Sequence, residues 1–121
     1  MALIELTTDT FDHAVTGDGI VLVDWWASWC GPCRMFAPVF EAAAAYTDIV
    51  FAKVDTEAQA ALAGRAKIMC IPTLMAFRDG VVVYARPGAL PPAVLEELIG
   101  KVRDLDMDQV RSIVASQAAA S

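Results

Sequence analysis

Residues 25–38, WWASWCGPCRMFAP, hold two cysteines, Cys30 and Cys33, two residues apart at the end of an apolar run. Two thiols at this spacing can bind a metal ion, hold a fold together as a disulfide, or alternate between dithiol and disulfide. The rest of the chain narrows these three possibilities.

The composition limits the size class of the protein and its partners. With 121 residues, 57% of them hydrophobic and 20% charged, the chain is predicted to form one domain around one core. Its formal charge is −6 and it has no basic cluster, so we expect no nucleic acid and no membrane as partner. No apolar run reaches about 18 residues and the first residues lack a signal-peptide pattern, which predicts a cytoplasmic protein.

The cysteine count argues against a metal site. Cys30, Cys33 and Cys70 are too few for an all-thiolate zinc site, and their number is odd for a disulfide framework. The single histidine, His13, lies in a polar segment, and a zinc site would need it or a second chain as the fourth ligand. We therefore expect no metal, and a redox pair becomes the leading interpretation.

Hydrophobic periodicity predicts the element order β-α-β-α-β-α-β-β-α. Strands are expected at residues 3–6, 20–27 and 49–55, followed by a β-hairpin at residues 73–85 that turns at Gly80. Helices are expected at residues 7–16, 33–46, 56–67 and 90–105, the first capped by Thr8 and the third by Thr56. The second helix is predicted to carry an apolar stripe of Met35, Val39, Ala42 and Ala43, with Phe36 and Phe40 beside it. Strand–helix alternation and the hairpin together predict an α/β domain with a mixed sheet.

The position of the cysteine pair indicates its chemistry. Cys30 falls where strand gives way to helix, and the free N–H groups at a helix N-terminus favour a thiolate. Cys33 lies one turn farther along on the same side, from where it can attack a mixed disulfide formed by Cys30. Gly31 and Pro32 argue against two ordinary core cysteines, because neither is a helical packing residue. The pattern predicts Cys30, at the more exposed end, as nucleophile and Cys33 as resolving thiol.

Together these residues resemble the active-site segment of the thioredoxin family, in which C-G-P-C follows a tryptophan. The motifs VLVD, AKVD, IPT, FRDG and PGAL also stand at the expected distances. The resemblance implies the thioredoxin fold over residues 1–104, a central mixed five-stranded sheet flanked by four helices. It also implies a protein-disulfide reductase with no cofactor besides its redox-active Cys30–Cys33 disulfide. Such a protein acts on disulfide-containing proteins and is recharged by NADPH-dependent thioredoxin reductase.

Two charged residues in the strands support this assignment. A carboxylate at Asp24, within a strand covered on both faces, is costly unless it has a task, and burial raises its pKa toward neutrality. The resemblance places Asp24 beneath Cys33 as its proton acceptor. Lys53 resembles the family lysine that faces this aspartate and tunes its pKa, although a lysine extending to solvent from a strand edge fits equally well.

The resemblance also assigns a substrate-binding surface to Trp29, Gly31, Pro32, Ile71, Pro72 and Gly88. Pro72 is expected to follow a cis peptide bond, and its loop to lie against the disulfide. Gly88 is expected near the active-site surface, where the lack of a side chain lets a partner approach. Trp26 is expected to support the loop from the core.

Two other functions remain open from the sequence. An oxidase or isomerase would need a less reducing dipeptide than Gly31-Pro32 and an oxidising compartment. A non-catalytic thioredoxin-fold subunit or interaction module is not excluded by an intact cysteine pair.

Cys70 and the chain beyond Arg103 are not explained by these motifs. We expect a monomer. Cys70 either packs as a small side chain at the rim of the substrate groove or, on oxidation, joins two copies in a disulfide-linked dimer. Residues 105–121 are predicted to form a short helical extension. Asp106 and Gln109 resemble a capping box, Val110, Ile113 and Val114 form an apolar stripe, and residues 116–121 are expected to fray.

Overall fold

A five-stranded sheet forms the centre of the computed structural model, which describes residues 3–120. Its strands are β1 (Leu3–Glu5), β2 (Ile20–Trp26), β3 (Ile49–Asp55), β4 (Thr73–Arg78) and β5 (Val81–Pro87), in the spatial order β1-β3-β2-β4-β5. β3 pairs in parallel with β1 and β2, whereas β4 pairs antiparallel with β2 and β5. The predicted mixed sheet is confirmed, with β2 at its centre.

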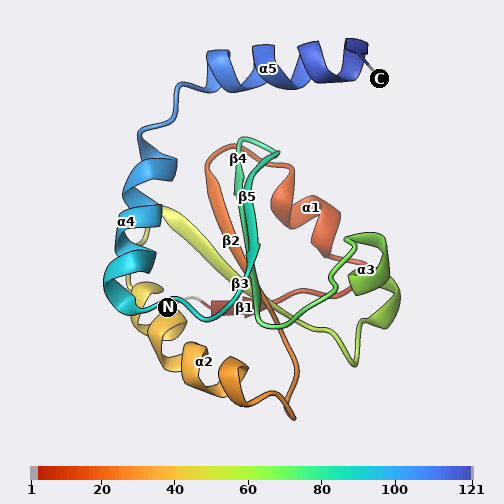
Figure 1. Cartoon of the computed structure of the whole chain (residues 1–121), viewed down its shortest axis with the longest axis vertical. Helices are drawn as coiled ribbons and strands as arrows, with labels where there is room; N and C mark the ends of the chain where they lie inside the picture. The colour runs from red at the N-terminus through yellow and green to blue at the C-terminus, as the bar shows by residue number, and fades with distance from the viewer. Residues whose placement is uncertain (1–2, 121) are drawn as a thin grey trace.

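Helices cover both faces of this sheet. Those of the described residues are α1 (Phe11–Val15), α2 (Gly31–Ala43), α3 (Ala60–Arg65), α4 (Pro92–Arg103) and α5 (Met107–Ala120). Figure 1 shows α2 and α4 on one side of the sheet and α1 and α3 on the other. Because β2 is covered on both faces, its sequence is apolar along almost its whole length rather than alternating.

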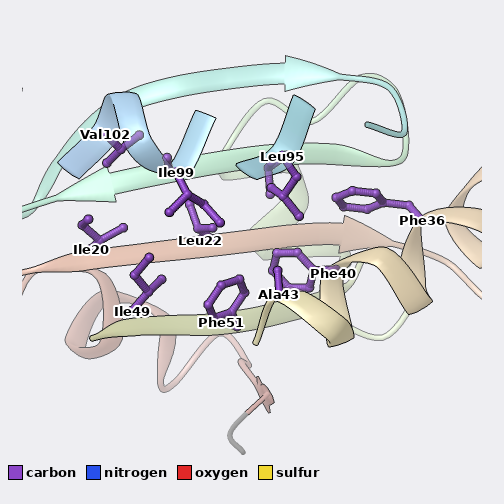
Figure 2. Packing of buried hydrophobic residues seen from close by; sticks show 12 residues of the cluster. Ile20, Leu22, Phe36, Phe40, Ala43, Ile49, Phe51, Leu95, Ile99 and Val102 are labelled. Carbon is purple, nitrogen blue, oxygen red and sulfur yellow. The ribbon is translucent and has the colours of Figure 1, made fainter. Parts of the chain in front are cut away.

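The core consists of two apolar layers separated by the sheet. In one layer Leu22 and Phe51 of the sheet pack with Phe40 of α2 and Leu95 of α4, as Figure 2 shows. In the other, residues of β2 and β3 pack against α1 and α3. Full burial of a leucine or phenylalanine contributes about 1.5–3 kcal/mol, so these layers hold the helices on the sheet.

The stripe predicted for α2 is mostly wrong. Met35 is 74% exposed, whereas Phe36, Phe40 and Ala43 are buried against the sheet. The two candidate stripes differ by about one residue of rotation, and the face with the two phenylalanines buries more apolar area. Met35 consequently points to solvent in the first half of the helix.

Neither threonine predicted as an N-cap serves as one. The N-cap of α1 is Thr10 and that of α3 is Gln59, and neither makes a side-chain capping bond. Thr8 instead donates its backbone N–H and hydroxyl to Gln59 Oε1, and the Thr56 hydroxyl donates to the Trp26 carbonyl. Short polar side chains bond readily to nearby backbone, so both residues fasten loops, and the helices start later than predicted.

The β4–β5 hairpin and the end of α4 are joined by Arg78. The hairpin turns on Asp79 and Gly80, both with positive φ, which is the two-residue turn that matches strand twist. The Arg78 guanidinium donates to the carbonyls of Val102, Arg103 and Leu105 at 2.7–3.0 Å. The last carbonyls of a helix have few partners within it, so the Arg78 guanidinium fastens the end of α4 to the hairpin.

The extension forms a longer helix than predicted. Asp106 Oδ1 accepts the backbone N–H groups of Asp108 and Gln109, as expected of an N-cap, and Met107 is buried. The helix continues through residues 116–120, which were expected to fray, since alanine is a strong helix former; residue 121 lies outside the described residues. Ile113 and Val114 remain about half exposed, and Figure 1 shows α5 running away from α4.

Candidate active site

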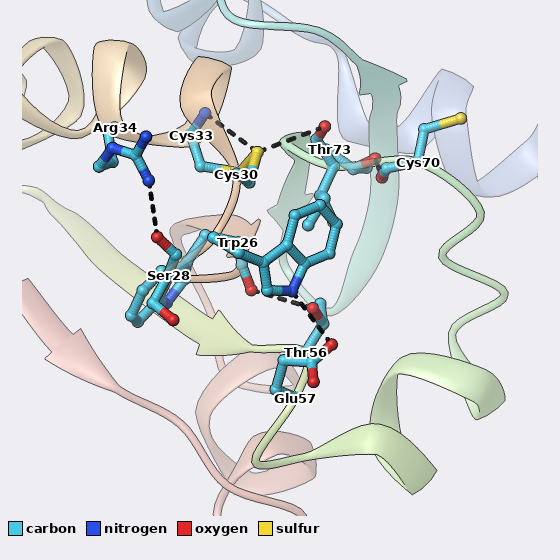
Figure 3. The surroundings of a disulfide bond; sticks show 11 residues. Trp26, Ser28, Cys30, Cys33, Arg34, Thr56, Glu57, Cys70 and Thr73 are labelled. Carbon is cyan, nitrogen blue, oxygen red and sulfur yellow. Dashed lines mark hydrogen bonds between the residues drawn. A yellow bond between two sulfur atoms is a disulfide. The ribbon is translucent and has the colours of Figure 1, made fainter.

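Cys30 and Cys33 form a disulfide at the N-terminus of α2, as Figure 3 shows. Cys30 is the N-cap residue, and its Sγ accepts the backbone N–H of Cys33 at 3.2 Å. Gly31 and Pro32 form the first turn, where the missing N–H of proline leaves no hydrogen bond unmade. The helix dipole and this N–H both favour negative charge on the Cys30 sulfur in the reduced state.

The surroundings distinguish the two cysteines, but their exposure does not. In the disulfide Cys30 is 4% exposed and Cys33 is 3% exposed, so the predicted difference in accessibility is not found in this state. The Cys30 sulfur lies 3.8 Å from the carbonyl oxygen of Ile71, on the loop before β4. Cys33 instead lines a partly open cavity together with Asp24.

Asp24 occupies the wall of this cavity, which has a volume of about 90 Å³. Its side chain is 3% exposed, and Oδ1 has no hydrogen-bond partner among the described residues. Burial raises the pKa of Asp24 from 3.8 to about 7, and the charge of Lys53 lowers it in part. A carboxyl group with this pKa can take up or release a proton near neutral pH.

Lys53 stands beside Asp24 in the sheet. The two residues are register partners in the parallel pair β2–β3, and both line the cavity. The Lys53 Nζ lies 4.4 Å from the centroid of the Trp26 ring, a cation–π distance. Trp26 also packs against the cysteine pair, in agreement with the expected supporting role.

The loop before β4 brings the predicted substrate-side residues toward the disulfide. The Ile71–Pro72 peptide bond is cis, as predicted. The Pro72 carbonyl accepts the backbone N–H of Gly88 at 2.8 Å, so Gly88 lies next to this loop. Its φ of +115° is a conformation that favours glycine, and an added Cβ would meet nothing within 4 Å. The backbone conformation therefore already accounts for a glycine at this position.

Apolar side chains are unusually exposed around the disulfide. Among the described large hydrophobic residues, Met69, Met35 and Trp29 have the highest exposures, at 90%, 74% and 65%. Met35 follows Cys33 by two residues, and Met69 and Trp29 line one shallow hollow. An apolar surface around a reactive group is typical of a site that contacts other proteins.

Two charged residues at the site belong to no motif recognised in the sequence. Glu57 Oε2 accepts the indole N–H of Trp29 at 3.3 Å, and Arg34 donates to the Ser28 carbonyl at 2.8 Å while lining the Asp24 cavity. Glu57 follows the carboxyl end of β3, and the carboxyl ends of parallel strands meet at one edge of a sheet. That rule could have placed it near Trp29.

Among residues 3–120, no group of three or more histidine, cysteine, aspartate or glutamate side chains is arranged to hold a metal ion. None of the described helices has the length and apolar character needed to cross a membrane.

Comparisons with known proteins agree with this geometry. Residues 2–101 match the thioredoxin family profile. "Putative thioredoxin 2" of Streptomyces coelicolor is 56% identical over 117 residues, covering 96% of this chain and 87% of that protein. The thioredoxin of Bacillus subtilis is 40% identical over 103 residues, covering 84% of this chain and 98% of that protein.

The fold is also found in solved structures. A mutant thioredoxin from Halobacterium salinarum aligns with a TM-score of 0.79 at 33% identity, covering 86% of this chain and 93% of that one. The expected thioredoxin fold is therefore confirmed. This chain belongs to the thioredoxin family, whose members are thiol–disulfide oxidoreductases.

Proposed function

We propose that the protein reduces disulfide bonds in other proteins, with Cys30 as nucleophile and Cys33 as resolving thiol. One observation carries the assignment of roles: of the two cysteines, Cys33 shares the cavity of Asp24, whereas Cys30 faces the Ile71 loop. The thiol that must lose a proton inside the protein is thus the one beside a carboxyl group of near-neutral pKa.

The first step is attack on the substrate. The Cys30 thiolate forms a bond to one sulfur of the substrate disulfide, the substrate S–S bond breaks, and the other substrate sulfur leaves as a thiolate. The N-terminus of α2 and the Cys33 N–H stabilise the attacking anion before the reaction.

The second step releases the product. Cys33 transfers its proton to Asp24 and attacks the Cys30 sulfur, so the mixed disulfide breaks and the substrate leaves as its second thiolate. With a pKa of about 7, Asp24 is ionised in about half of the molecules at neutral pH and can accept this proton. Two electrons pass to the substrate, and the protein ends with the Cys30–Cys33 disulfide.

The surface around the disulfide fits protein substrates. We assign Trp29, Gly31, Pro32, Ile71, Pro72 and Gly88 to substrate binding, because Trp29 and Ile71 line the exposed hollow and Gly88 bonds to Pro72. The oxidised pair would be recharged by thioredoxin reductase with electrons from NADPH. We place this cycle in the cytoplasm, carried out by a monomer without a further cofactor.

The division of the chain is part of the proposal. Residues 1–104 would form the thioredoxin domain and residues 105–121 an extension. The family match ends at residue 101, and residues 111–119 of the extension are exposed.

Insulin reduction tests this function directly. Wild-type protein with NADPH and thioredoxin reductase should reduce insulin, Cys30→Ser should not, and Cys70→Ser should retain the activity. A folded wild type without turnover, or a fully active Cys30→Ser variant, would reject the proposal.

A further inference from the structure

Residues 68–70 form a wall between two hollows at the active-site end of the sheet. The first is the hollow with Trp29 and Ile71. The second has a volume of about 230 Å³, and the apolar residues in its lining include Ile68, Met69, Cys70, Met75, Ala85 and Pro87. We refer to it as the Met75 hollow. Pockets for drug-sized ligands have about 300–1,000 Å³, so this one is sized for a side chain rather than a metabolite.

The Met75 hollow is continuous with the surface that faces the disulfide. Met69 and Cys70 belong to both hollows, and Ile71, the next residue, has its carbonyl 3.8 Å from the Cys30 sulfur. Figure 3 shows the Cys70 side chain directed away from the disulfide. A substrate chain that runs alongside residues 69–71 would therefore pass from the Cys30 sulfur to the Met75 hollow.

The lining is apolar and adaptable. Among the described residues that form it, Lys67 carries the only charge. Methionine side chains at Met69 and Met75 can adjust to different apolar shapes, which suits a protein that acts on many substrates. An aliphatic side chain matches this lining better than a polar one.

We propose that the Met75 hollow is a substrate subsite that takes an apolar side chain two residues from the cysteine attacked by Cys30. The inference rests on the proposed function. Strands advance about 3.3 Å per residue and alternate residues point to the same face. When the substrate cysteine lies opposite Ile71, the substrate residue two positions away from that cysteine lies opposite Met69, at the mouth of the Met75 hollow.

Matched disulfide peptides test the subsite. The peptides carry leucine or serine at the second residue before the cysteine, or at the second residue after it, and kcat/KM is measured with thioredoxin reductase and NADPH. For wild type, leucine should exceed serine by about tenfold at one of these positions. Ala85→Leu, which fills the hollow, should reduce this ratio to near one. Val82→Leu is the matched control, because Val82 is an exposed residue of β5 outside the lining, and it should keep the wild-type ratio.

The ratio compares two peptides on the same sample, so a partly folded variant does not imitate the result. A second variant, Met75→Ala, enlarges the hollow, and with a further peptide that carries phenylalanine at the same position it should shift the preference from leucine toward phenylalanine. Equal rates for all peptides with wild type, or an unchanged ratio in Ala85→Leu, would overturn the subsite alone. Reduction of none of the peptides by wild type would overturn the proposed function and the subsite with it.

A second copy of the chain is the competing occupant of the hollow. Sedimentation under reducing conditions should show a monomer for wild type and for Ala85→Leu. A wild-type dimer that Ala85→Leu dissociates would place another copy in the hollow and overturn the proposal.

Discussion

Asp24 and Lys53 are partners in the register of the two parallel strands at the centre of the sheet, and both line the cavity that reaches Cys33. Burial raises the pKa of Asp24 to about 7, while the Lys53 charge opposes that rise. In the proposed mechanism this pair sets the pH at which Cys33 can lose its proton.

Asp24→Asn should raise the free energy of unfolding at alkaline pH. The pKa of Asp24 is about 7 in the fold and 3.8 in its ordinary state, so between these values the unfolded chain binds fewer protons than the folded one. Wild-type stability therefore falls as pH rises from about 4 to about 7, by up to about 4 kcal/mol. Urea unfolding should show the asparagine variant more stable at about pH 8 and similar near pH 4. Parallel pH profiles for the two proteins would refute the burial argument.

The same variant should slow the release of mixed disulfides. Without the carboxylate, Cys33 has no internal proton acceptor, and a positioned general base contributes about 10²–10⁴-fold. Stopped-flow measurement of the resolution step at neutral pH should show the loss, whereas the attack by Cys30 should change less. Equal resolution rates from mildly acidic to mildly alkaline pH would reject the role of Asp24.

Lys53→Met should raise the pKa of Asp24 further, because the positive charge that favours the carboxylate is removed. NMR titration of the Asp24 carboxyl would measure the shift, and the pH profile of resolution should move in the same alkaline direction. Lys101→Met, an exposed lysine of α4, is the matched control and should leave both unchanged. An unchanged Asp24 titration in Lys53→Met would favour a lysine that only extends to solvent.

Truncation after Leu105 should preserve insulin reduction, because α5 contributes none of the proposed site residues. It removes the buried Met107, so the free energy of unfolding should fall by about 1.5–3 kcal/mol. Met107→Ala in the full chain should reproduce most of this loss. If truncation abolished activity in a folded protein, the extension would belong to the working domain.

Cys70 should join two copies under mild oxidation. Its thiol is free and exposed, and peroxide can convert two such thiols to one disulfide. Non-reducing electrophoresis should show a dimer for wild type, no dimer for Cys70→Ser, and return to monomer with a dithiol. A wild type that stays monomeric would leave Cys70 as a packing residue.

The sheet could be predicted from the sequence because its signals are local and strong. The apolar runs at β2 and β3 and the turn at Gly80 appear in the structure at or within one residue of the predicted places. Helix faces and caps were less predictable. Whether Met35 or Phe36 turns inward depends on the sheet surface below, and whether Thr56 caps a helix depends on the competing Trp26 carbonyl.

Some residues of the candidate site could likewise be predicted from the sequence, and others could not. The spacing of Cys30 and Cys33 and the cost of a buried Asp24 are visible in the sequence, since both are chemical anomalies in their segments. The cis bond before Pro72 required the family resemblance, because nothing in the local sequence forces it. Glu57 has no pattern of its own, and only the meeting of strand ends reveals its bond to Trp29.

Mass spectrometry of a trapped intermediate identifies the cysteine that attacks the substrate. Cys33→Ser lacks the resolving thiol, so on reaction with a disulfide protein it should accumulate a mixed disulfide. We expect peptide mapping to place the adduct on Cys30, and we expect Asp24→Asn, with both thiols intact, to accumulate the same adduct transiently. An adduct on Cys70, or normal turnover by Cys33→Ser, would contradict it.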